Sequence, residues 1–482
     1  MISLLFILLV PLATALAVSR LTAWPNVREA ISLLSGGFLF ALVLSLIPSV
    51  LDGSQPSYTI AEPIAGLPIQ LRAEPLGVIF SATASFLWLV TTLYSIGYMR
   101  SHGASNQSRF YAFFAVAITS TMGVAFSANL FTLFLFYELL TFSTYPLVTH
   151  TGTVAARKAG RTYLSILLTT SMAFFLVAIV WTWNLSGTGD FKIGGILEDN
   201  ATPFTIGLLY ALFVFGIGKA ALMPFHRWLP AAMVAPTPVS ALLHAVAVVK
   251  AGVFAILKIT IYIFGLDLIG ETGMSTWLLW VASATIVIAS LIALQQDNLK
   301  RRLAYSTVSQ LSYIVMGAIL ANSNAILGAT MHITMHAVGK ITLFFCAGAI
   351  LVASHKTRVS EMDGLGRRMP FTMAAFFVGA ISVAGLPPLG GFWGKWHLAL
   401  GSLDAGYSIL VAVLMVSTLL NIAYLIPIPL RAFFFKGPSQ EYCGIKEAPV
   451  ACLLAMGITA FCSLVLFFYP EPLYQLVIEI VN

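Results

Sequence analysis

The chain has 482 residues, of which 59% are hydrophobic and only 9% are charged. A soluble domain carries about 25% charged residues, so this composition excludes a soluble protein and indicates a polytopic membrane protein. The net charge of +7 is explained by basic residues in the loops between apolar segments, and nucleic acid is therefore not an expected partner.

Apolar runs of about 20 residues predict membrane-spanning helices. Fourteen such segments follow one another along the chain, at residues 2–19, 30–50, 75–98, 109–126, 129–149, 160–183, 203–230, 238–264, 275–294, 303–321, 324–353, 371–400, 406–434 and 449–469. The first lacks a basic start and is followed by further spans, so we expect an uncleaved helix instead of a signal peptide. The fold class expected is all-α and polytopic.

The seventh and twelfth spans are interrupted by the stretches "LMPFHRWLP" and "GLPPLGGFWG". Proline and glycine break helices, and such breaks at membrane depth occur inside protein or along a wet cavity. Each broken helix is fourth in a set of five, namely helices 4–8 and 9–13. Because five is odd, the second set is expected to run inverted across the membrane.

This pattern predicts four regions. They are residues 1–108 with helices 1–3, 109–264 with the first five-helix repeat, 275–434 with the inverted second repeat, and 435–482 with helix 14 and a tail. Basic loop residues gather on one side of the predicted membrane, and the opposite loops hold only Arg72 and Lys192. The positive-inside rule then places both termini on the outer side of a bacterial or archaeal cell membrane.

Several titratable residues lie inside the predicted spans. Glu138, in "FYELLTFSTYPLV", is the only carboxylate near the centre of a span, whereas Lys219, Lys250 and Lys395 all lie inside predicted spans. A charge at the bilayer centre costs at least about 2.5–3.5 kcal/mol, so these residues are expected to face the protein interior. One carboxylate cannot neutralise several lysines, and burial favours the uncharged amine, which suits the lysines to proton exchange.

Histidines extend this set. His332 and His336 lie four residues apart, with Lys340 four residues further, so all three share one helix face. Histidine titrates near physiological pH, which makes a proton relay the natural use of such a face. His244, six residues before Lys250, and His226, at the break of the seventh span, are further candidates. For His226, a relay role and a structural role at the helix break stay equally open.

Lys258, the cysteines and the remaining sequence motifs give weaker indications of function. Lys258 lies closer to the membrane edge than Lys250, so either snorkelling to the surface or a buried role is open. The cysteines at positions 346, 443, 452 and 462 match no zinc or iron–sulfur spacing, and we interpret them as packing residues. No nucleotide-binding motif is found. The sequence therefore predicts no cofactor, no metal and no catalytic site of its own.

Four stretches carry a resemblance to a known family. They are "FYELLTFSTYPLV", "GIGKAALMPFHRWLPAAMVAPTPVSALLHAVAVVKAGVF", "DNLKRRLAYSTVSQLSYIVMG" and "GLPPLGGFWGKW". Over residues 70 to 430 the chain resembles the antiporter-like subunits shared by Mrp-type cation/proton antiporters, respiratory complex I and membrane-bound hydrogenases. The resemblance implies fourteen helices in two inverted five-helix repeats.

The resemblance also assigns roles. Glu138 matches the glutamate of helix 5 and Lys219 the lysine of helix 7, a pair thought to control proton loading. Lys250 matches the connecting lysine of helix 8, and Lys395 matches the helix-12 lysine near the exit. His332 and His336 fall in the helix-11 relay region, whereas Lys340 is less clearly placed.

Within the family, the chain looks most like the D-type member of the Mrp antiporters, because position 395 is lysine and no long lateral helix follows. The expected partners are other membrane subunits, H+, Na+ and membrane lipid. The alternative is a proton-pumping subunit of an NADH-quinone oxidoreductase or a membrane-bound hydrogenase. A haem- or quinone-bearing protein is disfavoured because His332 and His336 share one face, and a solute transporter because no binding pocket is evident.

Overall fold

A computed structural model describes residues 2–197, 201–273, 275–436 and 444–481 of the chain. Cys443, one of the four expected packing cysteines, lies outside these residues, whereas Cys346 and Cys452 are buried and Cys462 is partly buried. The first half of the bundle contains α1 (Ile2–Arg20), α2 (Pro25–Leu44), α3 (Ile47–Leu51), α4 (Pro75–Ser101), α5 (Gln107–Ala125), α6 (Leu130–Val148), α7 (Val154–Thr170), α8 (Leu176–Ser186), α9 (Pro203–Gly216), α10 (Trp228–Ala231), α11 (Thr237–Ala241), α12 (Val248–Ile259) and α13 (Leu266–Thr272). The second half contains α14 (Thr276–Gln295), α15 (Leu299–Leu320), α16 (Ser323–Ser354), α17 (Pro370–Ala384), α18 (Gly391–Asp404), α19 (Ser408–Leu425), α20 (Pro427–Phe434), α21 (Val450–Phe468) and α22 (Glu471–Val481).

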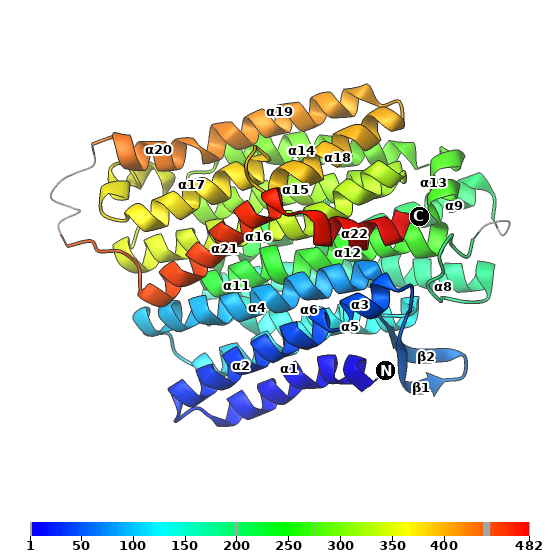
Figure 1. Cartoon of the computed structure of the whole chain (residues 1–482), viewed down its shortest axis with the longest axis horizontal. Coiled ribbons are helices and arrows are strands. Elements are labelled where there is room, and N and C mark those ends of the chain that lie inside the picture. The colour runs from blue at the N-terminus through cyan, green and yellow to red at the C-terminus, as the bar shows by residue number, and fades with distance from the viewer. Residues whose placement is uncertain (1, 198–200, 274, 437–443, 482) are drawn as a thin grey trace.

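The long helices lie side by side with their axes roughly aligned, so the molecule is a layered helical bundle (Figure 1). The N-terminal helices form one side and α19 forms the opposite side. Both termini lie at the same end of the bundle, together with the hairpin of β1 (Ser57–Ile64) and β2 (Leu67–Arg72). The all-α membrane fold expected from the sequence is confirmed, with this hairpin as an addition.

Eleven helices among the described residues are long and apolar enough to cross a membrane. Two further apolar helices, α9 and α17, are shorter because each is the first part of a broken span. The predicted number of fourteen spans is therefore not confirmed by helix length and composition. The inverted relation between the two repeats and the four predicted regions stay predictions.

Both predicted helix breaks are present. After α9 the chain forms a 3-10 turn over Gly218–Ala220 and becomes irregular until α10. After α17 it turns at Gly385, whose φ of +79° favours glycine, and resumes as α18. Because α9 already ends at Gly216, Lys219 lies inside the first break.

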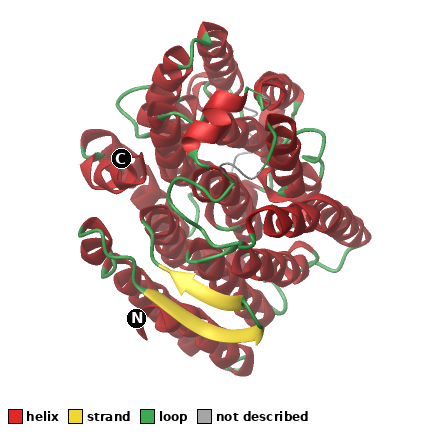
Figure 2. Cartoon of the chain, turned by 90° about the vertical axis from the view of Figure 1, so that its right-hand side faces the viewer, coloured by secondary structure: helices red, strands yellow, loops and turns green. Residues whose placement is uncertain are grey.

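The β-hairpin is the main element that the sequence analysis missed. Its two strands pair antiparallel, and their inner end meets the loop between α5 and α6, where the Ala128 amide donates to the Gln70 carbonyl over 3.0 Å. Figure 2 shows the hairpin at one end of the helical bundle. The stretch is short and lies between two strongly apolar segments, so a search for membrane spans reads it as a loop.

The core lies along α12 and α16. The segment Thr237–Phe264, which contains α11 and α12, is wholly buried. The 32-residue helix α16 packs against α4, α12, α15, α17, α18 and α21. Side chains on the facing sides of α12 and α16 are thereby withdrawn from lipid, and this is where the predicted titratable residues lie.

Candidate functional site

The site begins at α6, which carries Glu138. The residue is 7% exposed, its two carboxylate oxygens are buried, and neither oxygen has a hydrogen-bond partner among the described residues. The amine of Lys219 contacts the same helix on both sides of this residue: it donates to the Tyr137 carbonyl over 2.7 Å and to the Thr141 hydroxyl over 2.6 Å. Glu138 and Lys219 are thus brought to one place.

Their charges do not form a direct pair. Within the described part of the chain, no Lys219 nitrogen lies within 4.0 Å of a Glu138 oxygen. Lys219 also lies 3.1 Å from the centre of the Tyr137 ring, a cation–π contact. Because Tyr137 and Thr141 flank Glu138 on α6, a change of side-chain rotamer is the short route by which the amine would exchange these neutral acceptors for the carboxylate.

Glycine allows the broken segment to approach α12. A Cβ atom at Gly252 would lie 2.3 Å from the Ala220 nitrogen and 2.5 Å from the Lys219 carbonyl carbon. Such separations are well inside van der Waals contact, so only glycine fits. This close approach sets Lys219 against the helix that also carries Lys250.

Lys250 and His336 form a direct contact between α12 and α16. The Lys250 amine lies 2.7 Å from His336 Nδ1, and both side chains are buried. Two positive charges at this separation would repel by about 6 kcal/mol at an effective dielectric constant of 20. The pair therefore holds one proton far more easily than two.

Further buried polar side chains follow His336 along α16 and the neighbouring α15. The His332 and His336 rings stack with centroids 5.6 Å apart, and His332 Nε2 lies 3.0 Å from Gln310 Oε1 on α15. Tyr313, one turn further along α15, lies 5.6 Å from the His332 ring. We call Glu138, Lys219, Lys250, His336, His332 and Lys395 the buried row.

Lys395 forms the far end of the row. Its amine donates to the Ala384 carbonyl over 2.7 Å and to the Thr418 hydroxyl over 3.2 Å. It lies 5.1 Å from the centre of the Tyr313 ring, so Tyr313 stands between His332 and Lys395. Like Lys219, Lys395 is held by neutral oxygens beside a helix break.

Lys340 is directed away from this line. Its amine donates to the Ser306 hydroxyl over 2.7 Å, and the same hydroxyl accepts from the Tyr424 hydroxyl over 2.9 Å. The Tyr424 hydroxyl also contacts the Asn421 side-chain oxygen on α19, and its single proton can serve only one of these two acceptors at a time. Lys340 therefore begins a side branch of hydroxyl and amide groups between α15, α16 and α19.

The remaining candidate histidines differ from each other. His244 lies in a π-helical turn over Leu242–Val246, is wholly buried, and has no hydrogen-bond partner for either ring nitrogen within the described ranges. Its ring packs 4.7 Å from that of Phe344 on α16. His226 is only half-buried and packs against Tyr305 at 6.1 Å, outside the row.

Lys258 does not snorkel to the surface, which was one of the two expectations. Its side chain is fully buried, and its amine lies 3.0 Å from Glu74 Oε2 and 2.6 Å from the Ser127 carbonyl. Arg72 donates to the other Glu74 oxygen over 2.8 Å. The correction arises because Glu74, directly before α4, and the Ser127 carbonyl, between α5 and α6, meet this end of α12.

Several polar partners in the site were not predicted from the sequence. They include Tyr137, Thr141, Ser306, Gln310, Tyr313, Thr418, Asn421 and Tyr424. Three of them could have been found from the sequence. Ser306, Gln310 and Tyr313 are spaced by four and three residues, so they form a polar stripe on an apolar helix.

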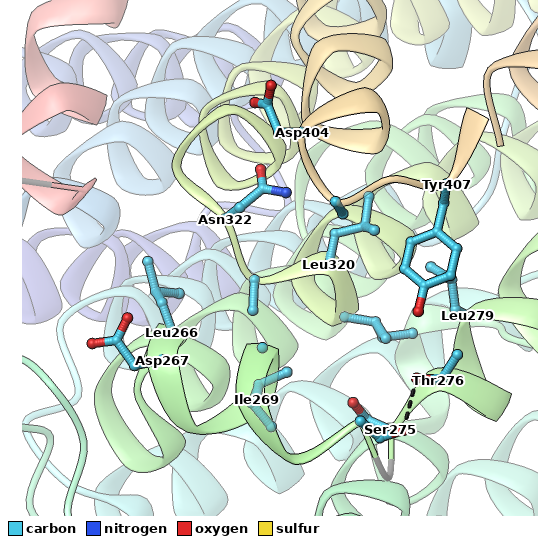
Figure 3. A pocket seen from close by; sticks show the side chains of 15 residues that line it. Leu266, Asp267, Ile269, Ser275, Thr276, Leu279, Leu320, Asn322, Asp404 and Tyr407 are labelled. Atoms are coloured by element: carbon cyan, nitrogen blue, oxygen red, sulfur yellow. Dashed lines mark hydrogen bonds between the residues drawn. The ribbon is translucent and has the colours of Figure 1, made fainter.

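The pockets near the surface differ in character from the row. One, of about 350 Å³, lies among α13, α14 and the ends of α15 and α18. Figure 3 shows its Asp267 and Asp404 carboxylates on separate sides, with Asn322 closer to Asp404. No group of three or more His, Cys, Asp or Glu side chains suited to a metal ion occurs in the described part of the chain.

Comparison with known families gives one match. Residues 127–421 match the family described as NADH:quinone oxidoreductase/Mrp antiporter, TM. This range contains more than half of the chain and every residue of the buried row.

Individual relatives come from several kinds of complex. The chain is 33% identical to NADH-quinone oxidoreductase subunit N of Desulforudis audaxviator, over 87% of this chain and 84% of the relative. It is 30% identical to hydrogenase-4 component B of Escherichia coli, over 70% of this chain. It spans only 51% of the length of that hydrogenase component, and 50% of the chloroplast NAD(P)H-quinone oxidoreductase subunit 5 of Adiantum capillus-veneris.

Solved structures share the fold. A chain of the Mrp complex from Dietzia sp. DQ12-45-1b superposes with a TM-score of 0.86 at 23% identity, over 99% of this chain and 96% of that chain. A chain of an archaeal membrane-bound sulfane sulfur reductase superposes with a TM-score of 0.83 at 25% identity, over 96% of this chain and 76% of that chain.

Proposed function

Because the chain belongs to the NADH:quinone oxidoreductase/Mrp antiporter membrane family, we propose that it moves protons along the buried row between Glu138 and Lys395. The observation that carries the proposal is the contact of Lys250 with His336. It joins α12 to α16 at the centre of the molecule, and the stacked histidines extend it toward Lys395.

The chemistry follows from charge and position. Protonation of Glu138 removes its negative charge, so only the unprotonated carboxylate attracts the Lys219 amine. When Lys219 turns from Tyr137 and Thr141 toward a charged Glu138, its positive charge moves away from α12. The next lysine, Lys250, then accepts a proton more easily, since repulsion between two cations in a medium of low dielectric constant is strong.

The second half of the row passes the proton on. Lys250 and His336 share one proton, and His332 and Gln310 extend the line toward Tyr313. Lys395 is the terminal acceptor in this scheme. Lys340, with Ser306 and Tyr424, is proposed as a side branch that tunes His336 by its charge. His244 is proposed as a further proton carrier beside this branch, and no role in the row is assigned to His226.

The test is proton transport by the complete complex in sealed vesicles. Glu138→Gln keeps the size of the side chain and removes its charge, so we expect a pH gradient at least tenfold smaller than that of the wild type. Glu479→Gln, at an exposed position on α22, is the matched control and should transport normally. Unchanged transport by Glu138→Gln would refute the proposed role of the row.

At the finer level, we propose that the complex exchanges Na+ for H+. The likeness in fold to a chain of the Mrp complex supports this proposal. In the same vesicles, addition of Na+ should collapse a pre-formed pH gradient without any electron donor.

The second candidate is a proton-pumping subunit of a redox complex. The identity to NADH-quinone oxidoreductase subunit N and to hydrogenase-4 component B favours it. If co-purifying subunits carry iron–sulfur or flavin groups, and proton movement needs an electron donor, this candidate replaces Na+/H+ exchange. In either case other membrane subunits are the proposed partners, and the proposed cellular location is a bacterial or archaeal cell membrane.

A further inference from the structure

A groove between α1 and α5 opens on the flank of the bundle. It has a volume of about 460 Å³. One part of its lining is apolar and consists of Leu12, Leu16, Ala112, Phe113 and Val116. Leu12 is 39% and Leu16 is 61% exposed, so this wall faces the surroundings of the bundle.

The mouth of the groove has a different character. It is formed where α1 ends and α5 begins, by Ser19, Thr22, Asn106 and Arg109. Arg109 is exposed and is the only charged residue among those lining the groove. One of its terminal nitrogens lies 3.5 Å from the His150 carbonyl, which leaves its other donors for a ligand. Arg20, also exposed, follows Ser19 at the end of α1.

We propose that this groove binds an anionic phospholipid, with its phosphate at Arg109 and one acyl chain along Leu16 and Leu12. Basic pockets between membrane helices suit anionic headgroups on the side that carries the basic loops. The choice of occupant rests on this charge complementarity. A partner helix would instead have to bury the Arg109 guanidinium, at a cost.

The dimensions agree with a lipid of one leaflet. Leu12 and Ser19 are seven positions apart in the chain, as are Arg109 and Val116. Since an α-helix rises 1.5 Å per residue, each wall is about 10 Å long. The hydrocarbon core of a bilayer is about 30 Å thick, so the groove holds most of one acyl chain from one leaflet. The proposal does not depend on proton transport.

The experiment counts lipids that remain on the purified complex by native mass spectrometry. Phosphatidylglycerol and phosphatidylcholine with the same acyl chains are added in separate arms. Arg109→Gln removes the charge, and Ala112→Trp fills the groove. Arg157→Gln removes an exposed arginine from α7 and is the matched control.

We expect wild type and Arg157→Gln to retain phosphatidylglycerol in preference to phosphatidylcholine. Arg109→Gln should bind phosphatidylglycerol about fivefold more weakly, as loss of roughly 1 kcal/mol per basic side chain implies. Ala112→Trp should lose the tightly held molecule. Equal retention by all variants, or no preference between the two lipids, would overturn the proposal.

A photo-reactive amino acid in place of Phe113 distinguishes the rival occupants. Cross-linking in the native membrane should add the mass of a phospholipid to this chain. A cross-link to a neighbouring subunit, or to a second copy of this chain, would show a protein interface and would also overturn the proposal.

Discussion

The buried lysines fall into two kinds according to their partners. Lys219, Lys340 and Lys395 donate to neutral carbonyl or hydroxyl oxygens, and Lys250 meets a histidine. Lys258 alone among these five lies against a carboxylate, that of Glu74. A neutral partner stabilises the amine whether or not it is charged, whereas a carboxylate holds it charged. This difference separates the proposed carriers from a structural ion pair.

At Lys250 the prediction concerns transport. Lys250→Met removes the group that joins α12 to α16 and keeps an apolar side chain of similar length. We expect proton transport to fall about 100-fold, the lower end of what a positioned proton-transfer group contributes. The measurement is the initial rate of acidification in vesicles. Lys192→Met, at an exposed loop position, serves as control, and a normal rate in Lys250→Met would contradict the proposed path.

At Lys258 the prediction concerns stability. Glu74→Gln leaves a buried amine without its counter-charge, and removing one partner of a buried pair costs about 3–5 kcal/mol. The double variant Glu74→Gln with Lys258→Met should recover much of this loss, because neither charge then remains. Thermal unfolding followed by tryptophan fluorescence measures both. Additive losses in the double variant would show that the two residues are not coupled.

Among the elements, the two helix breaks and the π-helical turn before α12 have three titratable residues in or beside them, and the other residues of the buried row lie in regular helices. Lys219 lies in the first break, Lys395 follows the second by one turn of α18, and His244 lies in the π-helical turn before α12. A break frees backbone groups from the regular helical pattern. Lys395 uses one of them, since it donates to the Ala384 carbonyl at the end of α17.

The approach of α12 to the first break gives a prediction at this scale. Gly252→Ala places a methyl group against the backbone of Lys219 and Ala220, which cannot move independently. We expect a loss of about 1–3 kcal/mol in stability, as for other overpacked cores, together with slower transport. Gly457→Ala on α21, where an added Cβ meets nothing within 4 Å, should leave both unchanged.

Helix positions and breaks could be predicted because they are local properties of the sequence. The length of an apolar run indicates a membrane span, and the prolines and glycines of "GLPPLGG" indicate the end of a helix. The contact between Lys258 and Glu74 could not be predicted, since 184 positions separate the two residues and only the packing of the folded chain brings them together. Likewise, spacing placed His332 and His336 on one face, but only the packing of α12 against α16 brings Lys250 to His336.

For the whole molecule, the buried row crosses from one half of the bundle to the other. Glu138 and Lys219 belong to the first half, while His332 and Lys395 belong to the second. The basic loops predict which end of the bundle faces the cytoplasm. Both termini and the hairpin share one end (Figure 1), and we expect this end to face outward.

This orientation can be measured by labelling whole cells with a membrane-impermeant maleimide. A cysteine at Glu62, in the exposed hairpin, should react from outside, whereas a cysteine at Arg157, at the start of α7, should react only after the membrane is opened. The parent chain gives the background from its own cysteines. The reverse pattern would invert the predicted topology.

The Lys250–His336 contact limits how many protons the centre of the proposed path can hold at once. Along the proposed path, repulsion between two basic groups 2.7 Å apart leaves room for one proton at a time. A further proton from the Glu138 side would reach this pair only after the first has left toward Lys395, so protons would cross between the two halves of the bundle one after another.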